Sequence, residues 1–518
     1  MPKIVQISVP PEKAHIEDYV FHLALQKSGL YDQDIKEWKL KKRSIDARKR
    51  PVKIQLAVEL FLKGDEITSP IRKVEFKDVS SADPVHIIGA GPAGLFAALA
   101  CLENGLKPIV YERGKDVRTR RRDLAKLNKE HELNPESNYC YGEGGAGTYS
   151  DGKLYTRSTK RGDVNQVLSL LVHHGADAEI MVESHPHIGT NKLPGIITAI
   201  RETIIEFGGE VHFDHKMTDL EWGKNTLQRI KINNDQWVKV SNLVLATGHS
   251  ARDVFQLLQD KNITLEYKPF ALGVRVEHPQ ELINKIQYHG IGFSEYLPPA
   301  TYSLVEQVEG KGVYSFCMCP GGIIAPCATE STAVVSNGWS PSKRNNPYAN
   351  SGMVVEVMDE LVDAFKSYGP LKGLKFQEKV EQDCWKAAGK TQALPAQRLL
   401  DFVNGTLSKD LPKCSYVPGV VSVRLDQILP EPIARRLQKG FLAFGKKLKG
   451  FLTNDAIIVA PESRTSSPVR IPRTKTFEHV EVSNLYPCAE GAGYAGGIMS
   501  AAIDGIKVIE SIKLKKES

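Results

Sequence analysis

The 518-residue chain lacks the features that mark secreted, zinc-binding and disulfide-rich proteins. Its eight cysteines are sparse, they form no Cys-x-x-Cys pair, and no Cys/His cluster has the spacing of a zinc site. The first twenty residues lack the apolar core of a signal peptide. These absences argue against a disulfide scaffold, and they predict reduced thiols, no metal site and a cytoplasmic protein.

A strong charge imbalance and a clean membrane span are missing too. Lys and Arg exceed Asp and Glu by 68 to 61, a surplus of +7 that does not by itself indicate nucleic acid. Residues 84–102 carry no formal charge and nearly reach the length of a membrane helix, but glycines divide them into a short strand, a turn and a helix. We therefore expect no contact with a membrane, and the length predicts two or three folded domains.

Residues 1–80 predict a small α+β domain of βαββ order. Residues 5–9 alternate like a strand, residues 14–28 have helical periodicity, and residues 35–45 and 52–62 resemble two further strands. The sequence SSAD at 80–83 is typical of a linker.

Nine basic residues gather between positions 36 and 53 of this domain. The simpler interpretation is a solvated strand face, and the alternative is an acidic partner such as RNA. The nine are Lys36, Lys39, Lys41, Lys42, Arg43, Arg48, Lys49, Arg50 and Lys53.

The remainder predicts an α/β fold with a Rossmann-like domain at 84–264 plus 461–518 and an inserted α+β substrate or cap domain at 265–460. The Gly-rich segment from 461 suggests that the chain returns to the first of these domains. We predict helices at 193–207, 353–367, 430–449 and 497–512, short strands within 210–240 and a buried strand at 242–247.

The strongest motif follows a predicted buried strand at 85–88. Gly89 would make the tight turn, Gly91 would allow a diphosphate to approach the backbone, and Gly94 would allow the next helix to pack on the strand. The N-terminus of that helix would point free N–H groups and a positive dipole at the phosphates. Strand, glycines and helix together predict a site for a dinucleotide.

A second strand at 108–111 ends in Glu112, 18 residues after Gly94. A carboxylate at this point can accept hydrogen bonds from ribose hydroxyls and disfavours a 2′-phosphate. NAD and FAD both present this adenosine half, so the motif alone leaves the choice open.

Two distant segments favour FAD. In the first, the strand within NLVLATGHS runs into Thr247 and Gly248. In the second, residues 485–505, a short strand meets Glu490 and Gly491 before a glycine turn and a helix, whose N-terminus could face the flavin pyrimidine carbonyl. Residues 491–496 also spell Gly-x-Gly-x-x-Gly, but too little chain follows for a second nucleotide fold.

Six stretches of the chain carry a resemblance to a known family. They are GAGPAGLFAA, ERG at 112–114, GEGGAGTYSDGKL at 142–154, FCMCPGG at 316–322, ESRTSSPVRIPR at 462–473 and CAEGAGYAGGI at 488–498. On these motifs the chain resembles the glutathione-reductase-like FAD superfamily, and more closely the uncharacterised FAD-dependent dehydrogenase family, whose members carry an extra small N-terminal domain. The resemblance implies the fold and FAD, and it supplies no substrate.

The resemblance also implies a set of cofactor-binding residues. The loop GEGGAG independently suits a site where a ligand touches backbone, although a flexible surface turn is an alternative. The ADP half would be held by Gly89, Gly91, Pro92, Ala93, Gly94, Glu112 and Arg113; the diphosphate or flavin edge would meet Gly145, Ala146, Gly147 and Thr148; and Thr247, Gly248, Glu490, Gly491, Gly493, Gly496 and Gly497 would complete the pocket.

Lys153 and Arg464 are the candidate catalytic residues. Lys153 would place a charge beside flavin or substrate, and its competing interpretation is an ion pair with Asp151. Arg464, with Arg470 and Arg473 in the same stretch, could grip a carboxylate or phosphate; the competitor is pairing with acids such as Glu462.

The cysteines give little support for a redox disulfide. The Cys-x-x-x-x-Cys of flavin disulfide reductases is absent downstream of the glycine motif, where Cys140 stands alone. In SFCMC the thiols of Cys317 and Cys319 would share one face of a strand, but a direct bridge would be strained. We expect these two and Cys327 to be buried and unreactive.

These observations predict an FAD-dependent oxidoreductase that acts on a small organic substrate by hydride transfer. The alternatives are an RNA-associated flavoprotein that uses the basic N-terminal module, and a flavin-binding module without turnover. Residues 160–460 show no second nucleotide motif, so NAD(P)H, if used, would bind only transiently as an electron donor.

Overall fold

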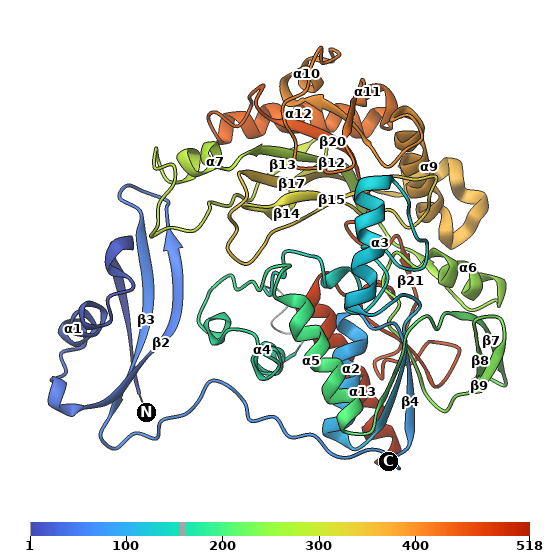
Figure 1. Ribbon diagram of the computed structural model, residues 1–518, viewed down its shortest axis with the longest axis horizontal. Coiled ribbons are helices and arrows are strands. Elements are labelled where there is room, and N and C mark those ends of the chain that lie inside the picture. The colour runs from blue at the N-terminus through green and yellow to red at the C-terminus, as the bar shows by residue number, and fades with distance from the viewer. Residues whose placement is uncertain (1, 156–161, 518) are drawn as a thin grey trace.

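The computed structural model describes residues 2–155 and 162–517, which form a mixed α/β structure (Figure 1). A three-stranded sheet, a five-stranded sheet and a seven-stranded sheet are built from different parts of the chain. The three-stranded sheet of the N-terminal residues stands at the left of Figure 1, with the seven-stranded sheet at the top and the five-stranded sheet below it.

The N-terminal residues fold in the predicted βαββ order. Strands β1 (Lys3–Val9) and β2 (Ile35–Asp46) both pair antiparallel with β3 (Lys53–Leu62), and α1 (Glu17–Ser28) packs beside β1. The alternating burial of β1 explains why its sequence pattern was informative.

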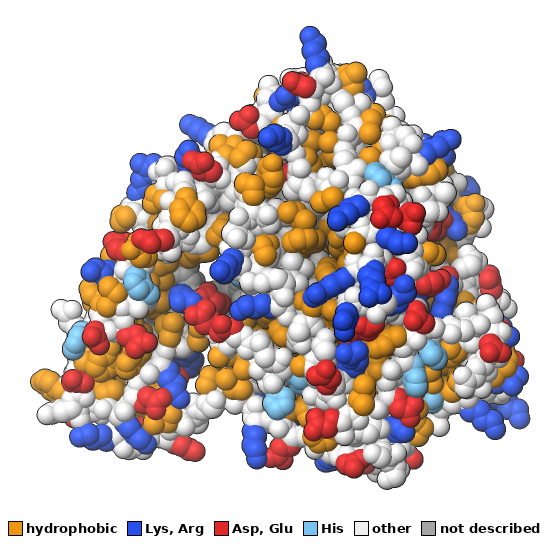
Figure 2. All heavy atoms as spheres, in the orientation of Figure 1, with side chains coloured by type: hydrophobic (Ala, Val, Ile, Leu, Met, Phe, Trp, Pro, Cys, Tyr) orange, Lys and Arg blue, Asp and Glu red, His pale blue; other side chains and the backbone are white. Residues whose placement is uncertain are grey.

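The basic side chains of this module are partly neutralised within the chain. Lys41 pairs with Glu59 at 3.1 Å, Arg48 pairs with Asp46 at 2.7 Å, and Arg43 pairs with Glu183 outside the module. Another positive cluster lies over helix α3 (Val117–Glu130), where Figure 2 shows Lys and Arg side chains gathered. Positive charge is therefore not confined to the N-terminal module.

The segment after β3 contacts the five-stranded sheet's domain rather than the N-terminal module. Val79 is fully buried there, and its N–H donates to the Phe207 carbonyl at 2.9 Å. Phe76 packs on the same hydrophobic cluster. Residues 74–82 are thus an ordered segment that packs on this domain rather than a free linker.

The five-stranded sheet is parallel throughout. Its order is β22 (Leu485–Pro487), β10 (Leu243–Leu245), β4 (Pro84–Ile88), β5 (Lys107–Tyr111) and β6 (Glu210–His212). Helices α2 (Pro92–Asn104), α5 (Leu193–Glu206) and α13 (Ile498–Glu517) lie beside one another next to this sheet (Figure 1). The predicted strand–turn–helix–strand unit is present as β4, α2 and β5, and the C-terminal strand β22 joins the sheet beside β10.

The seven-stranded sheet carries the middle of the chain. Its order is β13 (Val305–Val308), β14 (Lys311–Cys319), β17 (Tyr348–Val357), β12 (Phe270–Pro279), β20 (Ile457–Glu462), β18 (Leu394–Arg398) and β19 (Val420–Ser422). The pairs are antiparallel except β18 with β19.

The helix predicted at 353–367 is wrong in its first part. Residues 353–357 belong to β17, which lies between β12 and β14 and is almost wholly buried. A central strand buried on both faces reads as a continuous apolar run that periodicity cannot distinguish from a helix. The helix at 430–449 is confirmed as α12 (Glu431–Lys447), whereas α9 (Lys372–Ala387) was not predicted.

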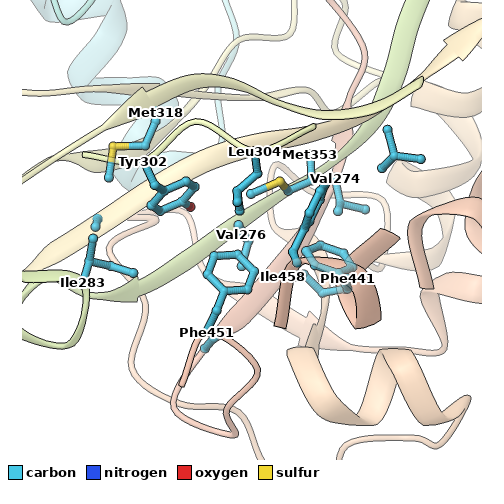
Figure 3. Close-up of a cluster of buried hydrophobic side chains, with 14 of the residues drawn as sticks. Val274, Val276, Ile283, Tyr302, Leu304, Met318, Met353, Phe441, Phe451 and Ile458 are labelled. Atoms are coloured by element: carbon cyan, nitrogen blue, oxygen red, sulfur yellow. The ribbon is translucent and has the colours of Figure 1, made fainter. Parts of the chain in front are cut away.

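A hydrophobic core joins this sheet to α12 (Figure 3). Val274 and Val276 of β12 lie close to Ile458 of β20, and Phe441 of α12 packs on the same cluster with Phe451. All five side chains are buried to within 1% exposure, so the sheet gives one wall of the site a rigid backing.

The remaining elements are shorter or connect these sheets. They are β7 (Met217–Gly223), β8 (Thr226–Ile232) and β9 (Gln236–Lys239) in one sheet, β11 (Glu266–Tyr267) with β21 (Val469–Arg470), β15 (Ile323–Pro326) with β16 (Ser336–Trp339), and helices α4 (Val164–His173), α6 (Arg252–Asp260), α7 (Gln280–Gln287), α8 (Asp359–Val362), α10 (Leu399–Asn404) and α11 (Leu425–Ile428). Among the described residues, no helix is both long enough and apolar enough to span a membrane.

Candidate functional site

A cavity of about 430 Å³ lies between the five-stranded and seven-stranded sheets. One side is formed by the segments that follow the carboxyl ends of β4, β5 and β10, and the other side includes the end of β14 and the segment after β20. The carboxyl end of a parallel sheet is where α/β folds place their ligands. The cavity therefore brings together segments from position 88 to position 501.

The β4–α2 turn forms one part of the wall, through Gly89, Gly91, Pro92 and Ala93. Gly89 has φ +102° and stands so close to β10 that an added Cβ would lie 2.5 Å from the Ala246 carbonyl oxygen. An added Cβ on Gly91 would instead point into open space, with its nearest neighbour 4.0 Å away. The backbone at Gly91 is thus bare toward the cavity, as a closely approaching diphosphate requires.

Helix α2 begins at this turn with Pro92 at its first position, and no side chain of the described residues caps it. Its first N–H groups and its positive dipole face the site. Gly94 lies outside the cavity and packs against the turn, which agrees with the packing role predicted for it and not with the expectation that it holds the ADP half.

Glu112 lines the cavity from the end of β5 and is only 5% exposed. Its carboxylate accepts backbone N–H bonds from Ala90, Gly114 and Gly142, each at 2.9 Å. Glu112 therefore ties together three loops around the predicted adenosine site, a structural task that the motif did not reveal. Carboxylate oxygens have room for further acceptance from ribose hydroxyls.

Arg113 also lines the cavity and is held in place by neighbours. Its guanidinium lies 4.2 Å from the centre of the Tyr141 ring and pairs with Glu136 at 2.6 Å and Asp253 at 2.8 Å. A fixed planar guanidinium stacked on an aromatic ring offers a flat edge to a ligand.

The loop GEGGAG reaches the cavity through Gly145, Ala146 and Gly147. Thr148 is an exception: it is fully buried, and its hydroxyl donates to the Glu143 carbonyl at 2.6 Å. The prediction that Thr148 lines the pocket is therefore wrong, because its short side chain closes the loop from behind. The buried Arg120 holds the same loop by donating to the Gly145 carbonyl at 2.9 Å.

From the C-terminal half, the cavity receives Thr247, Gly248, Glu490, Gly496 and Gly497. Gly491 and Gly493 lie behind the wall instead. An added Cβ on Gly491 would be 2.8 Å from the Gly248 carbonyl oxygen, and one on Gly493 would be 3.1 Å from that of Val469. The prediction that these two glycines line the pocket is therefore wrong, because they permit close packing of the backbone behind the wall.

His249 is a lining residue that the sequence reasoning missed, although it directly follows Gly248 in NLVLATGHS. Its Nε2 lies 3.6 Å from the Glu490 carboxylate, and burial lowers the pKa of this imidazole. Glu490 also accepts the backbone N–H of Gly497 at the start of α13. A neutral imidazole beside the cavity can donate or accept one hydrogen bond to a ligand.

Lys153 reaches the part of the wall formed by β14. Its ammonium lies 3.9 Å from the Cys317 sulfur, 3.8 Å from the Cys319 sulfur and 3.5 Å from the Asp151 carboxylate, and it donates to the Met318 carbonyl. Burial disfavours the charged form, but these sulfurs and the carboxylate outweigh it and raise the pKa of Lys153. The predicted pair with Asp151 thus occurs, and Lys153 lines the cavity.

Arg464 lines the cavity, but its guanidinium is committed to an acid that the sequence did not identify. Two of its nitrogens pair with the buried Glu381 of α9 at 3.2 and 3.1 Å, and a third donates to Thr329 at 3.0 Å. Glu462, the acid that the sequence suggested as a partner for Arg464, pairs instead with Arg275 at 2.8 Å.

The three arginines of the 464–473 stretch do not converge. Arg470 reaches Glu266 at 3.4 Å near the surface, and Arg473 pairs with Asp504 of α13 at 2.7 Å. Of the three, Arg464 is the one that lines the cavity. Within residues 2–155 and 162–517, no group of three or more His, Cys, Asp and Glu side chains is arranged to hold a metal ion.

The donor set fits FAD. A bare backbone at Gly91, an uncapped helix N-terminus and the buried carboxylate of Glu112 suit an adenosine diphosphate. The cavity continues past this end to Lys153 and Cys317, which leaves a lined space for a ring system and a substrate.

Comparison with known proteins agrees with this fit. Residues 269–465 match the family described as FAD-dependent protein, C-terminal domain-like, and residues 1–61 match a domain of unknown function. An uncharacterized protein of Clostridium beijerinckii is 42% identical over 509 residues, which cover 94% of each chain. FAD is accordingly the cofactor of this chain.

Solved structures give weaker likenesses. The protein CtdE, solved with FAD, is 9% identical with a TM-score of 0.34 over 84% of this chain and 85% of its own. A variant of the halogenase PltM, also solved with FAD, is 10% identical with a TM-score of 0.39 over 83% and 68%. These scores are too low to identify a shared fold, so the assignment of the cofactor rests on the family and the site.

Proposed function

Because this chain belongs to the same family as its Clostridium beijerinckii relative and carries the C-terminal domain of FAD-dependent proteins, we propose that it is an FAD-dependent oxidoreductase of the glutathione-reductase-like superfamily. The substrate would be a small organic molecule. The observation that carries the proposal is one continuous cavity that runs from the Gly91 turn to Lys153. A module that only stored FAD would not need a second, charged end.

We propose that the ADP half of FAD lies along the β4–α2 turn, with Glu112 toward the ribose and the 145–147 loop toward the diphosphate. The flavin end would then face Thr247, Gly248 and the segment 490–497. When bound, FAD supplies hydride chemistry that amino-acid side chains lack. The chain's own residues position the reactants and exclude water.

Lys153 is proposed to orient the substrate. A protonated ammonium at this wall would attract a carboxylate, phosphate or polarised carbonyl, and the Met318 carbonyl and Asp151 fix its direction. Arg464 would act beside it with less freedom, because Glu381 holds its guanidinium.

We propose the domain division 1–80, 84–264 plus 461–518, and 265–460, which the separate sheets support. Strand β20 runs two residues past the last boundary, to Glu462. A cytoplasmic location, transient use of NAD(P)H and no nucleic-acid partner complete the proposal. The RNA-associated alternative stays a prediction, and the internal ion pairs of Lys41, Arg43 and Arg48 weaken it.

The test is purification followed by an absorbance spectrum, identification of the flavin released on denaturation, and an anaerobic substrate screen. We expect a yellow protein that releases FAD rather than FMN, and a substrate that bleaches it repeatedly in the presence of an acceptor. Release of FMN would contradict the ADP site. Tight FAD without any turnover would support the binding-module alternative.

A further inference from the structure

Two cysteines that lie 187 positions apart meet at the edge of the FAD cavity. The Cys140 and Cys327 sulfurs are 3.3 Å apart. Cys140 lines the cavity from the loop before GEGGAG, whereas Cys327 follows β15 and lies just behind it, 5% exposed. Cys140 stands alone in the sequence downstream of the glycine motif, but in the folded chain Cys327, from the seven-stranded sheet's side of the cavity, supplies a second thiol.

The surroundings of this pair favour reactive sulfur. The Arg464 guanidinium lies 4.0 Å from the Cys140 sulfur, and the Asn337 amide lies 3.8 Å from the Cys327 sulfur. The hydrogen bond with Cys327 and the positive charge of Arg464 lower the pKa of the Cys140 thiol, against the opposing effect of burial. A thiolate is the form that attacks in thiol–disulfide chemistry.

The other cysteines are less suited to forming a disulfide at the cavity. Cys101 and Cys384 are fully buried among apolar neighbours, and burial raises the pKa of both thiols. Cys317 also lines the cavity, and Cys319 and Lys153 lower the pKa of its thiol. However, Cys317 and Cys319 lie two positions apart on β14, where a direct bridge would be strained.

We propose that Cys140 and Cys327 form a redox-active pair that converts between a dithiol and a disulfide and exchanges two electrons with the FAD of the same cavity. The inference rests on the proposed function for its electron partner. It implies that one substrate of the chain is either a thiol that donates electrons or a disulfide that accepts them.

The step balances without a further reactant. Oxidation of the pair breaks two S–H bonds, forms one S–S bond and releases two protons and two electrons, and FAD is an acceptor of the same two-electron stoichiometry. The sulfurs must approach by about 1.3 Å to reach the usual bond length of about 2 Å. The resulting bond would join the loop beside α3 to the loop beside β15, one from each side of the cavity.

The first experiment maps the bond in the FAD-loaded protein. The protein is oxidised anaerobically with oxidised glutathione, free thiols are alkylated, and peptides are analysed by mass spectrometry with and without reduction. We expect a linked peptide that contains Cys140 and Cys327. If both residues are recovered alkylated or bound to glutathione, and never linked to each other, the proposal is overturned.

The second experiment counts electrons. After the oxidant is removed, anaerobic titration with dithionite should consume about four electrons per FAD in the wild type and about two in Cys327→Ser. Cys384→Ala, a buried cysteine far along the chain on α9, should behave like the wild type. Uptake of about two electrons by the oxidised wild type would overturn the exchange with FAD even if the bond forms.

The two experiments separate this proposal from the proposed function. Loss of FAD binding is visible in the absorbance spectrum and leaves the mapping experiment intact. A disulfide that forms in a protein without turnover on any organic substrate would support the cysteine pair and contradict the oxidoreductase reaction proposed above. Cys140→Ser gives a second variant for the titration if Cys327→Ser does not fold.

Discussion

A Cβ atom on Gly94 would lie 1.9 Å from the Gly89 carbonyl oxygen, whereas a Cβ atom on Gly91 would meet nothing closer than 4.0 Å. Two glycines three positions apart in one motif therefore serve different purposes. Gly94 lets α2 pack on the turn, and Gly91 leaves space for the ligand. The structure separates a stability role from a binding role, and the first prediction uses this difference.

Gly91→Val should lose FAD while the protein stays folded. The valine side chain would enter the cavity where the diphosphate is proposed to lie, and such overpacking costs about 1–3 kcal/mol, or roughly 5- to 150-fold in Kd. FAD binding by fluorescence titration and the melting temperature of the apoprotein are the measurements. The matched variant Gly94→Ala should instead lower the melting temperature. Unchanged FAD affinity in Gly91→Val would place the cofactor elsewhere.

Glu112→Ala should destabilise the protein and weaken FAD binding together. The change leaves the N–H groups of Ala90, Gly114 and Gly142 without their acceptor, at about 1–3 kcal/mol for a buried donor left unpaired. Urea denaturation of the apoprotein measures the loss. The control is Glu210→Ala, which removes a half-exposed acid on the neighbouring strand β6. Equal stability of the two variants would contradict the role given to Glu112.

Features that depend on only a few neighbouring residues could be predicted from the sequence. The turn at Gly89, Gly91 and Gly94 could be predicted because each glycine answers a need of its own few residues. The first strand of the N-terminal module was predictable for the same reason, since the alternation in β1 reflects one buried face. Strand β17 was misread because a strand buried on both faces has no such alternation.

Contacts across the cavity could not be predicted from one sequence. Arg464 and Glu381 are 83 positions apart, and Cys140 and Cys327 are 187 apart, so no spacing rule brings either pair together. Thr148 was assigned to the pocket by its place in a motif, yet its hydroxyl turns inward to Glu143. The direction of a side chain in a loop depends on tertiary hydrogen bonds that a motif does not contain.

Lys153→Met should lower turnover by roughly 100-fold, the range seen when one fixed charge-stabilising donor is removed, while FAD content stays unchanged. The methionine keeps the length of the aliphatic part of the lysine side chain and removes the charge that the wall presents beside Cys317. Steady-state kinetics on the substrate found by screening and the ratio of FAD to protein are the two readouts. Lys129→Met, on the exposed face of α3, is the control. Full activity of Lys153→Met would remove this residue from the mechanism.

The stability of the folded protein at acid pH should depend on Glu381. Burial alone would raise the pKa of this carboxyl, but Arg252 and Arg464 outweigh burial and lower it. A lowered pKa in the folded protein means that the ion pair stabilises fully above the ordinary Glu pKa of about 4.3 and that this contribution is lost as the pH falls through the folded value. Glu381→Gln should therefore be less stable by about 3 kcal/mol at neutral pH.

The same variant should also show a flatter decline of stability below about pH 4, since its amide does not titrate. Urea unfolding at a series of pH values measures both effects. Glu360→Gln, which changes an acid 74% exposed on α8, should follow the wild type. Parallel curves for wild type and Glu381→Gln across this range would contradict the lowered pKa.

Reduction by NADH or NADPH should be slow and should not saturate at micromolar donor. In the described residues from 162 to 460, the strand pairs are antiparallel apart from the β5–β6, β4–β10 and β10–β22 pairs of the five-stranded sheet and the short β18–β19 pair. The loop between β18 and β19 has no Gly-x-Gly-x-x-Gly turn. A nicotinamide would thus have to enter the FAD cavity itself, where it competes with substrate. Stopped-flow reduction over a range of donor concentrations is the measurement, and a substrate-saturated sample is the control. A linear dependence on donor that substrate suppresses fits a transient reactant, and fast reduction that saturates at micromolar donor and is indifferent to substrate would reveal a dedicated nucleotide site.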